Sequence, residues 1–259
     1  MRRDEQLIDL FLRGYKDRDG YSYRLESRPD QTERAKPAVD CIAVSERGKR
    51  LAVEHTLVEP FEGQIADNRP FLAVFERLHH STELTLPNVL INILVPVGAI
   101  PKGVDWDQVG RRVVEWFRNA RLEVRSGDSD HKIPGLGFDL PVRIEAMELP
   151  DSPGVLVVGR LRPPDKLFSD MVRKALAAKL PKLVKTLADS RILLMEDASM
   201  ILGMTSFSHE IDVAREDYPD LGRVDSVWLA HTPVWDSERV VWFLHVWPDG
   251  VRDRFTINV

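Results

Sequence analysis

Apolar and polar positions alternate along the chain with the two periods that are typical of helices and strands. Apolar residues at helical spacing predict an amphipathic helix over 3–16, and period-two alternation predicts a strand over 21–27. Further helices are expected over about 70–84, 105–121 and 162–190, and further strands over 39–44, 50–56, 86–97, 141–149, 154–161, 191–197, 224–232 and 239–247. This succession of elements predicts an α/β fold.

Three of these segments carry more specific expectations. The strand over 86–97 is nearly continuous in aliphatic residues, which predicts that both of its faces are covered. Asp105 is expected to cap the N-terminus of the helix that follows it. Pro181 is expected to interrupt or kink the long helix over 162–190, because proline lacks the N–H of a helix interior. A polar, glycine-bearing stretch over 126–137 is expected to separate helix from strands.

Composition and charge restrict the class of protein. With 259 residues, 43% hydrophobic and 30% charged, the chain suits one large globular domain or a domain with a big insertion. The single cysteine, Cys41, lies in the apolar run VDCIAV, which favours a core position in a protein of the reducing cytoplasm. No run approaches the roughly 18 apolar residues of a membrane span, so no membrane partner is expected. The net charge of −5 does not indicate a nucleic-acid-binding protein, but a local basic face would be enough for one.

Two acidic residues stand inside apolar strands of one predicted hairpin. Asp40 lies at the start of the strand over 39–44, and Glu54 lies near the end of the strand over 50–56. The short connection SERGK allows antiparallel strands to bring the two carboxylates together. Buried carboxylates are costly unless they are paired, protonated or bound to a metal, and two of them suit a hard cation such as Mg²⁺ or Mn²⁺. The alternative is that both acids lie at exposed strand ends and only keep the edge soluble.

The order KPAVD, hairpin, LAVEHT resembles the PD-(D/E)XK, or restriction-endonuclease-like, nucleases. The resemblance implies a core of one helix, three strands, a helix and a strand. It implies that Asp40 and Glu54 bind the metal ion, with the backbone carbonyl of His55 as a third ligand. Thr56 occupies the position of the motif lysine and cannot replace an ammonium group. The resemblance therefore implies either that activity is lost or that the lysine comes from the helix that follows the third strand, as in some members of the family.

A later segment, ALAAKLPKLVKTLADSRILLMED, resembles the second core helix and fourth strand of the same family. Lys179 and Lys182 stand three residues apart in it and share about one helical face. They are candidates for the displaced lysine, or else form a solvated basic face. This assignment makes the chain a single PD-(D/E)XK-like domain, 1–259, with an insertion over 67–164. In the competing assignment, 70–84 and 86–95 are the core helix and strand, and the rest is an appended subdomain.

Other acids are weaker candidates. Glu5, on the first helix, matches a position where the family often places an extra glutamate, but a surface charge is the alternative. The literal Pro29–Asp30 and Glu33 lie in a polar connection before the hairpin. The chain has no H-E-x-x-H, phosphate-cradling glycine loop or G-x-S-x-G motif.

Two functions follow from the resemblance. The first is a Mg²⁺- or Mn²⁺-dependent nuclease that hydrolyses phosphodiester bonds of DNA or RNA, favoured by the intact acid pair. The second is a catalytically inactive module of the same fold that binds nucleic acid or a protein partner, favoured by Thr56. An α/β protein unrelated to the family is the third possibility.

Overall fold

The computed structural model describes residues 2–32, 38–79, 81–161, 165–199, 204–232, 235 and 239–259. The chain forms two compact units. Unit 1 consists of Met1–Pro60 together with Asp165–Val259, and unit 2 consists of Phe61–Pro164. Unit 2 therefore lies, in the sequence, between the two parts of unit 1. Within the described residues, no helix is both long and apolar enough to cross a membrane.

Unit 1 is built around a mixed seven-stranded sheet with the strand order β1-β2-β3-β8-β9-β10-β11. Its elements are α1 (Arg3–Gly14), β1 (Tyr23–Ser27), α2 (Pro29–Thr32), β2 (Cys41–Ser45), β3 (Arg50–Leu57), α5 (Asp165–Lys185), β8 (Ser190–Asp197), α6 (Met204–Ala214), η3 (Pro219–Arg223), β9 (Ser226–His231), β10 (Val240–Trp247) and β11 (Arg254–Asn258). The three central strands β3, β8 and β9 run parallel, and the flanking strands pair antiparallel. The protein is therefore a mixed α/β protein.

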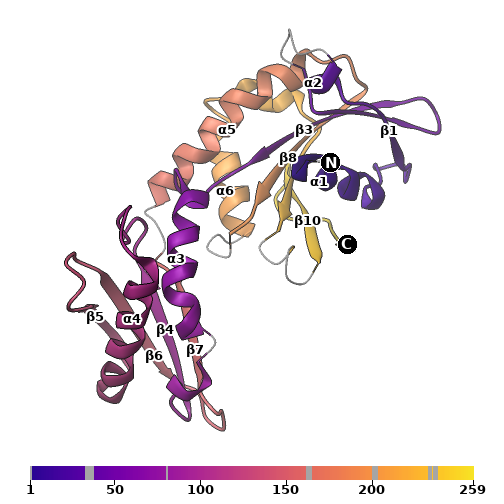
Figure 1. Ribbon diagram of the computed structural model, residues 1–259. Helices are drawn as coiled ribbons and strands as arrows, with labels where there is room; N and C mark the ends of the chain where they lie inside the picture. Colours follow the sequence, from indigo (N-terminus) through magenta and orange to yellow (C-terminus); the bar gives the residue numbers. More distant parts are fainter. Residues whose placement is uncertain are drawn as a thin grey trace. The chain divides into compact units, whose positions relative to one another are not determined.

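Both faces of this sheet are covered, with α1 on one side and α5 and α6 on the other (Figure 1). The apolar stripe of α1, including Leu7 and Phe11, packs in one core with Val53 of β3. The neighbouring strand residue, Ala52, packs in the other core with α5 residues such as Leu180. Because side chains alternate along a strand, consecutive residues of β3 enter different cores. Glu54 and His55 accordingly lie on opposite faces of the sheet.

Unit 2 contains a separate four-stranded sheet with the order β5-β6-β4-β7. Its elements are α3 (Gln64–His79), η1 (Thr82–Leu84), β4 (Val89–Val95), α4 (Trp106–Ala120), η2 (Arg121–Glu123), β5 (Gly127–Lys132), β6 (Pro141–Glu148) and β7 (Val155–Arg160). The helices α3 and α4 and the sheet share one apolar core. The Asp105 side chain accepts a hydrogen bond from the Gln108 N–H at 2.9 Å, which confirms the predicted cap of α4.

The structure corrects several sequence-based expectations. Only alternate residues of β4 (Ile91, Ile93 and Val95) are fully buried, so the expected cover on both faces is wrong. The polar stretch over 126–137 contains β5, an edge strand whose residues are largely exposed and which therefore lacks an apolar pattern. α3 begins at Gln64 and α5 continues past Pro181, although each contains a proline.

The pairing of β3 shows which of two predicted strands lies beside it in the sheet. The strand beside β3 is β8, whereas β4 belongs to the sheet of unit 2. The strand over 86–95 therefore does not extend the sheet of the hairpin, whereas the strand over 191–197 does. The helix α6 and the strand β11 had no counterpart among the predicted elements.

Candidate functional site

The β2–β3 hairpin holds Asp40 and Glu54 beside each other. Cys41 is the partner of Val53 in the antiparallel register, so Asp40, one residue earlier, lies opposite Glu54, one residue later. The Asp40 N–H donates a hydrogen bond to Glu54 Oε2 at 3.2 Å. In turn, the His55 N–H donates to Asp40 Oδ2 at 2.7 Å. Each carboxylate is thus held by a backbone N–H from the other strand segment.

Two lysines of α5 complete this group. Lys179 Nζ and Lys182 Nζ each lie 2.7 Å from the same oxygen, Glu54 Oε1. Lys182 Nζ also donates to the Ala38 carbonyl at 3.5 Å. Glu54 is completely buried, whereas the two lysine side chains are 22% and 24% exposed. The carboxylate therefore reaches no solvent, and the two ammonium groups supply its compensation.

The charges of the group shift its pKa values. Burial raises the pKa of the Glu54 carboxyl and the negative charge of Asp40 raises it further, while the lysines act in the opposite direction without outweighing both. Burial alone would lower the pKa of Lys182, but its hydrogen bond to Glu54 and the charges of Glu54 and Asp40 outweigh burial and raise it. The charge of Asp40 thus disfavours the charged form of Glu54, and the two lysines favour it.

In the described part of the chain, the other predicted acids make no hydrogen bond or ion pair with Asp40 or Glu54, although the charge of Asp30 acts on Lys182. Glu5 accepts hydrogen bonds from Arg2 Nε at 2.7 Å and Gln31 Nε2 at 2.8 Å, and the Arg2 hydrogen bond holds the pKa of Glu5 below its usual value. Within the described residues, Glu5 makes no hydrogen bond or ion pair with Asp40 or Glu54. Asp30 binds Arg2 at 2.9 Å. Thr56 places an uncharged hydroxyl at the motif lysine position, and Glu33 lies outside the described residues.

A second buried polar group, which the sequence reasoning missed, lies on the other face of the sheet. Glu196, only 3% exposed, binds His55 Nε2 at 3.2 Å, Thr232 Oγ1 at 2.7 Å and Arg3 Nε at 3.3 Å. Burial raises the pKa of Glu196, but these donors outweigh it, so the pKa lies below its ordinary value. The available signal was the pair of acids that ends the apolar run RILLMED. The His55 ring therefore binds Glu196 on the face of the sheet opposite to Glu54.

The oxygen donors at the hairpin suit one kind of cation. In the described part of the chain, no group of three or more His, Cys, Asp or Glu side chains is arranged to hold a metal ion. A zinc site of three or four such side chains is thus not formed there. Mg²⁺, by contrast, is bound through one or two carboxylates and keeps several waters. Asp40 and Glu54 supply that smaller number of carboxylates.

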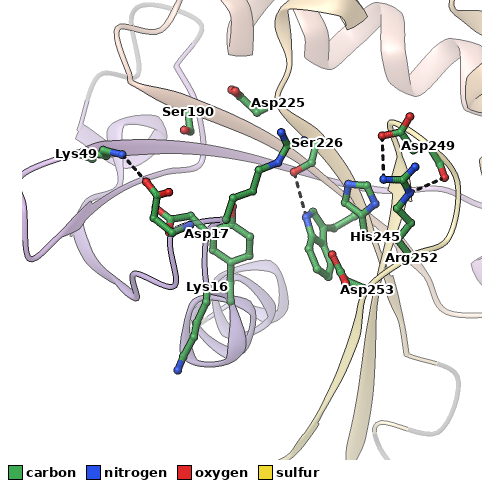
Figure 2. A pocket seen from close by; sticks show the side chains of 14 residues that line it. Lys16, Asp17, Lys49, Ser190, Asp225, Ser226, His245, Asp249, Arg252 and Asp253 are labelled. Carbon is green, nitrogen blue, oxygen red and sulfur yellow. Dashed lines mark hydrogen bonds and ion pairs between the residues drawn. The ribbon is translucent and has the colours of Figure 1, made fainter.

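A cavity of about 540 Å³ in unit 1 lies away from this site (Figure 2). It is bounded by the starts of β8 and β9 and by the turn between β10 and β11, and none of the predicted site residues lines it. Two ion pairs lie among its charged groups: Lys49 binds Asp19 at 3.1 Å and Arg252 binds Asp249 at 3.4 Å. The buried acid pair, not this cavity, therefore carries the candidate chemistry.

Comparison of the chain with models of protein families, with curated proteins and with solved structures finds no match.

Proposed function

We propose that this protein is a divalent-cation-dependent nuclease of the restriction-endonuclease-like type. The observation that carries the proposal is the arrival of Lys179 and Lys182 at Glu54, beside Asp40, in a chain whose motif lysine position holds Thr56. Two acids and a lysine around one point are the chemical set that the sequence resemblance implies. Here the lysine is contributed by a helix that is distant in the sequence.

The order of elements in unit 1 supports the same proposal. Once unit 2 and the one-turn helix α2 are set aside, α1, β1, β2, β3, α5 and β8 follow one another as helix, three strands, helix and strand. β1, β2 and β3 pair antiparallel in succession, and β3 runs parallel to β8. The proposal therefore assigns the core to unit 1 and treats unit 2 as an insertion.

The residues have distinct roles in the proposed reaction. Asp40, Glu54 and the His55 carbonyl hold the cation, which when bound polarises the phosphoryl group and acidifies a water. An ammonium group of α5 neutralises negative charge on the scissile phosphate, as charge-assisted hydrogen bonds do in phosphoryl-transfer sites. The hairpin N–H groups of Asp40 and His55 keep the two carboxylates oriented.

A second candidate function has one specific observation in its favour. Glu54 is already compensated by two lysines at 2.7 Å, so the site is electrically satisfied without a metal ion. A catalytically inactive module of the same architecture, which binds nucleic acid or a protein, would need only this charge compensation and no metal ion.

The two candidates are separated by activity and ion binding. The purified full chain is incubated with single- and double-stranded DNA and RNA, with Mg²⁺, Mn²⁺ or a chelator. The nuclease proposal expects cation-dependent cleavage and a cation-induced thermal shift in the wild type, and loss of both in Glu54→Gln. Glu148→Gln makes the same chemical change at an exposed position of unit 2 and serves as the matched control. A wild type with neither cleavage nor thermal shift contradicts the nuclease and favours the inactive module.

A further inference from the structure

One oxygen of Glu54 is shared by two cations. Lys179 Nζ and Lys182 Nζ both lie 2.7 Å from Glu54 Oε1, while Oε2 accepts the Asp40 N–H. Together with Asp40, the group consists of two carboxylates, of which Glu54 is fully buried, and two ammonium groups. In this arrangement the lysines are bound within the protein and are not directed to a ligand.

We propose that Glu54 sequesters Lys179 when no divalent cation is bound, and that cation binding releases Lys179 to contact a phosphate of the nucleic acid. The inference rests on the proposed function, since it concerns the same site, but it makes a separate statement: cation binding and phosphate binding are coupled through one lysine.

Electrostatic repulsion is the reason for the release. Like charges repel in proportion to their product, so a divalent ion repels an ammonium group twice as strongly as a unit charge at the same distance does. A cation at Glu54 therefore cannot share the carboxylate with both ammonium groups at their present distances. At least one lysine has to leave when the ion binds.

The contacts indicate that Lys179 is the lysine that leaves. Lys182 has a second acceptor in the Ala38 carbonyl and is also attracted by Asp40 and Asp30. Among the residues that the structure describes, Lys179 binds Glu54 alone. Its side chain is 22% exposed, so the ammonium can move into solvent without leaving its helix.

Lysine acylation tests the release without any measurement of activity. An ammonium group held against a buried carboxylate is shielded from the acylating reagent, so it reacts slowly. Ca²⁺, a hard cation with the same preference for oxygen ligands, should raise the acetylation rate of Lys179 several-fold, as followed by mass spectrometry. Lys185, exposed on the same helix, is the internal control and should not change. Ca²⁺ binding, seen as a thermal shift, with an unchanged rate at Lys179 would overturn the inference.

A variant tests the sequestration itself. In the Glu54→Gln variant, the reagent should acetylate Lys179 rapidly even when no divalent cation is present. It should also bind nucleic acid more tightly than the wild type in chelator, with a salt dependence steeper by about 0.9 for each additional phosphate that the protein neutralises. Glu196→Gln neutralises another buried carboxylate, for which no contact with Lys179 or Lys182 is found among the described residues, and it should change neither property. Equal behaviour of Glu54→Gln and Glu196→Gln would overturn the inference.

The results distinguish this inference from the proposed function. Cation-dependent cleavage by the wild type with a Lys179 rate insensitive to Ca²⁺ would leave the nuclease standing and remove the coupling. Absence of Ca²⁺ binding would remove the metal site and the cation-driven release together. In that case, fast acetylation of Lys179 in Glu54→Gln would still support sequestration. If either variant proves unstable, the Ca²⁺ titration of the wild type decides alone.

Discussion

Removing both lysines from Glu54 should cost more stability than the two single removals together. In Lys179→Met or Lys182→Met the remaining ammonium still lies at 2.7 Å from Glu54 Oε1. The loss should then be about 1 kcal/mol, below the roughly 1.5–3 kcal/mol of a hydrogen bond to a charged group, because the remaining ammonium still neutralises the carboxylate. The double variant leaves a fully buried carboxylate without a cation, which should cost about 3–5 kcal/mol. The excess over additivity of about 1–3 kcal/mol is in the range for residues of one network.

The pH dependence of the double variant follows from the raised pKa of Glu54. A carboxyl group whose folded pKa exceeds its unfolded value stabilises the protein below the unfolded pKa, about 4.3. This contribution is lost as the pH rises through the folded pKa. Burial already raises the pKa of Glu54 in the wild type, and removal of both lysines raises it further. The deficit of the double variant should therefore be small at pH 5 and large at pH 8.

Urea unfolding at the two pH values measures both effects. The free energy of unfolding is compared among the wild type, the two single variants and the double variant. In thermal unfolding, a loss of 3–5 kcal/mol corresponds to a fall in Tm of about 6–20 °C for a chain of this size. Adding Glu54→Gln to the double variant should restore most of the stability, because no buried charge remains. Additive single effects, or a deficit independent of pH, would refute the reasoning and show that water reaches Glu54.

Three further predictions concern other parts of the chain. Burial raises the pKa of the Cys41 thiol to about 12, so an aromatic disulfide reagent at pH 8 should leave the native protein unlabelled; rapid labelling would show that the strand opens. Gly154→Ala should destabilise unit 2 by more than the roughly 1–2 kcal/mol of a left-handed conformation, because its Cβ would also meet the Leu86 carbonyl. Gly137→Ala, with φ +75° and open space around it, should show the conformational cost alone in the same unfolding assay. Phe11→Ala removes a fully buried ring and should cost about 3–5 kcal/mol in urea unfolding; a loss below 1 kcal/mol would contradict its packing.

The sequence by itself determined the features that depend on near neighbours. Asp40 and Glu54 are only 14 positions apart in the hairpin, and the alternation of its apolar positions specifies which strand ends meet. The capping of α4 by Asp105 depends on three residues. The spacing of Lys179 and Lys182 likewise predicted a shared helical face before their partner was known. In each case the interacting residues are close in the sequence, so the local pattern is sufficient to predict the contact.

Only the tertiary structure decided what those groups meet. Lys179 is 125 residues from Glu54, and Glu196 is 141 residues from His55, with unit 2 lying between in the sequence. Both contacts depend on β3 running beside β8, and parallel pairing over such a distance leaves no local signal. For the same reason the apolar run of β4 could not reveal that only one of its faces is covered. The hydrophobicity of a strand indicates how much of its surface is buried. Which strands pair with it depends on the tertiary structure as a whole.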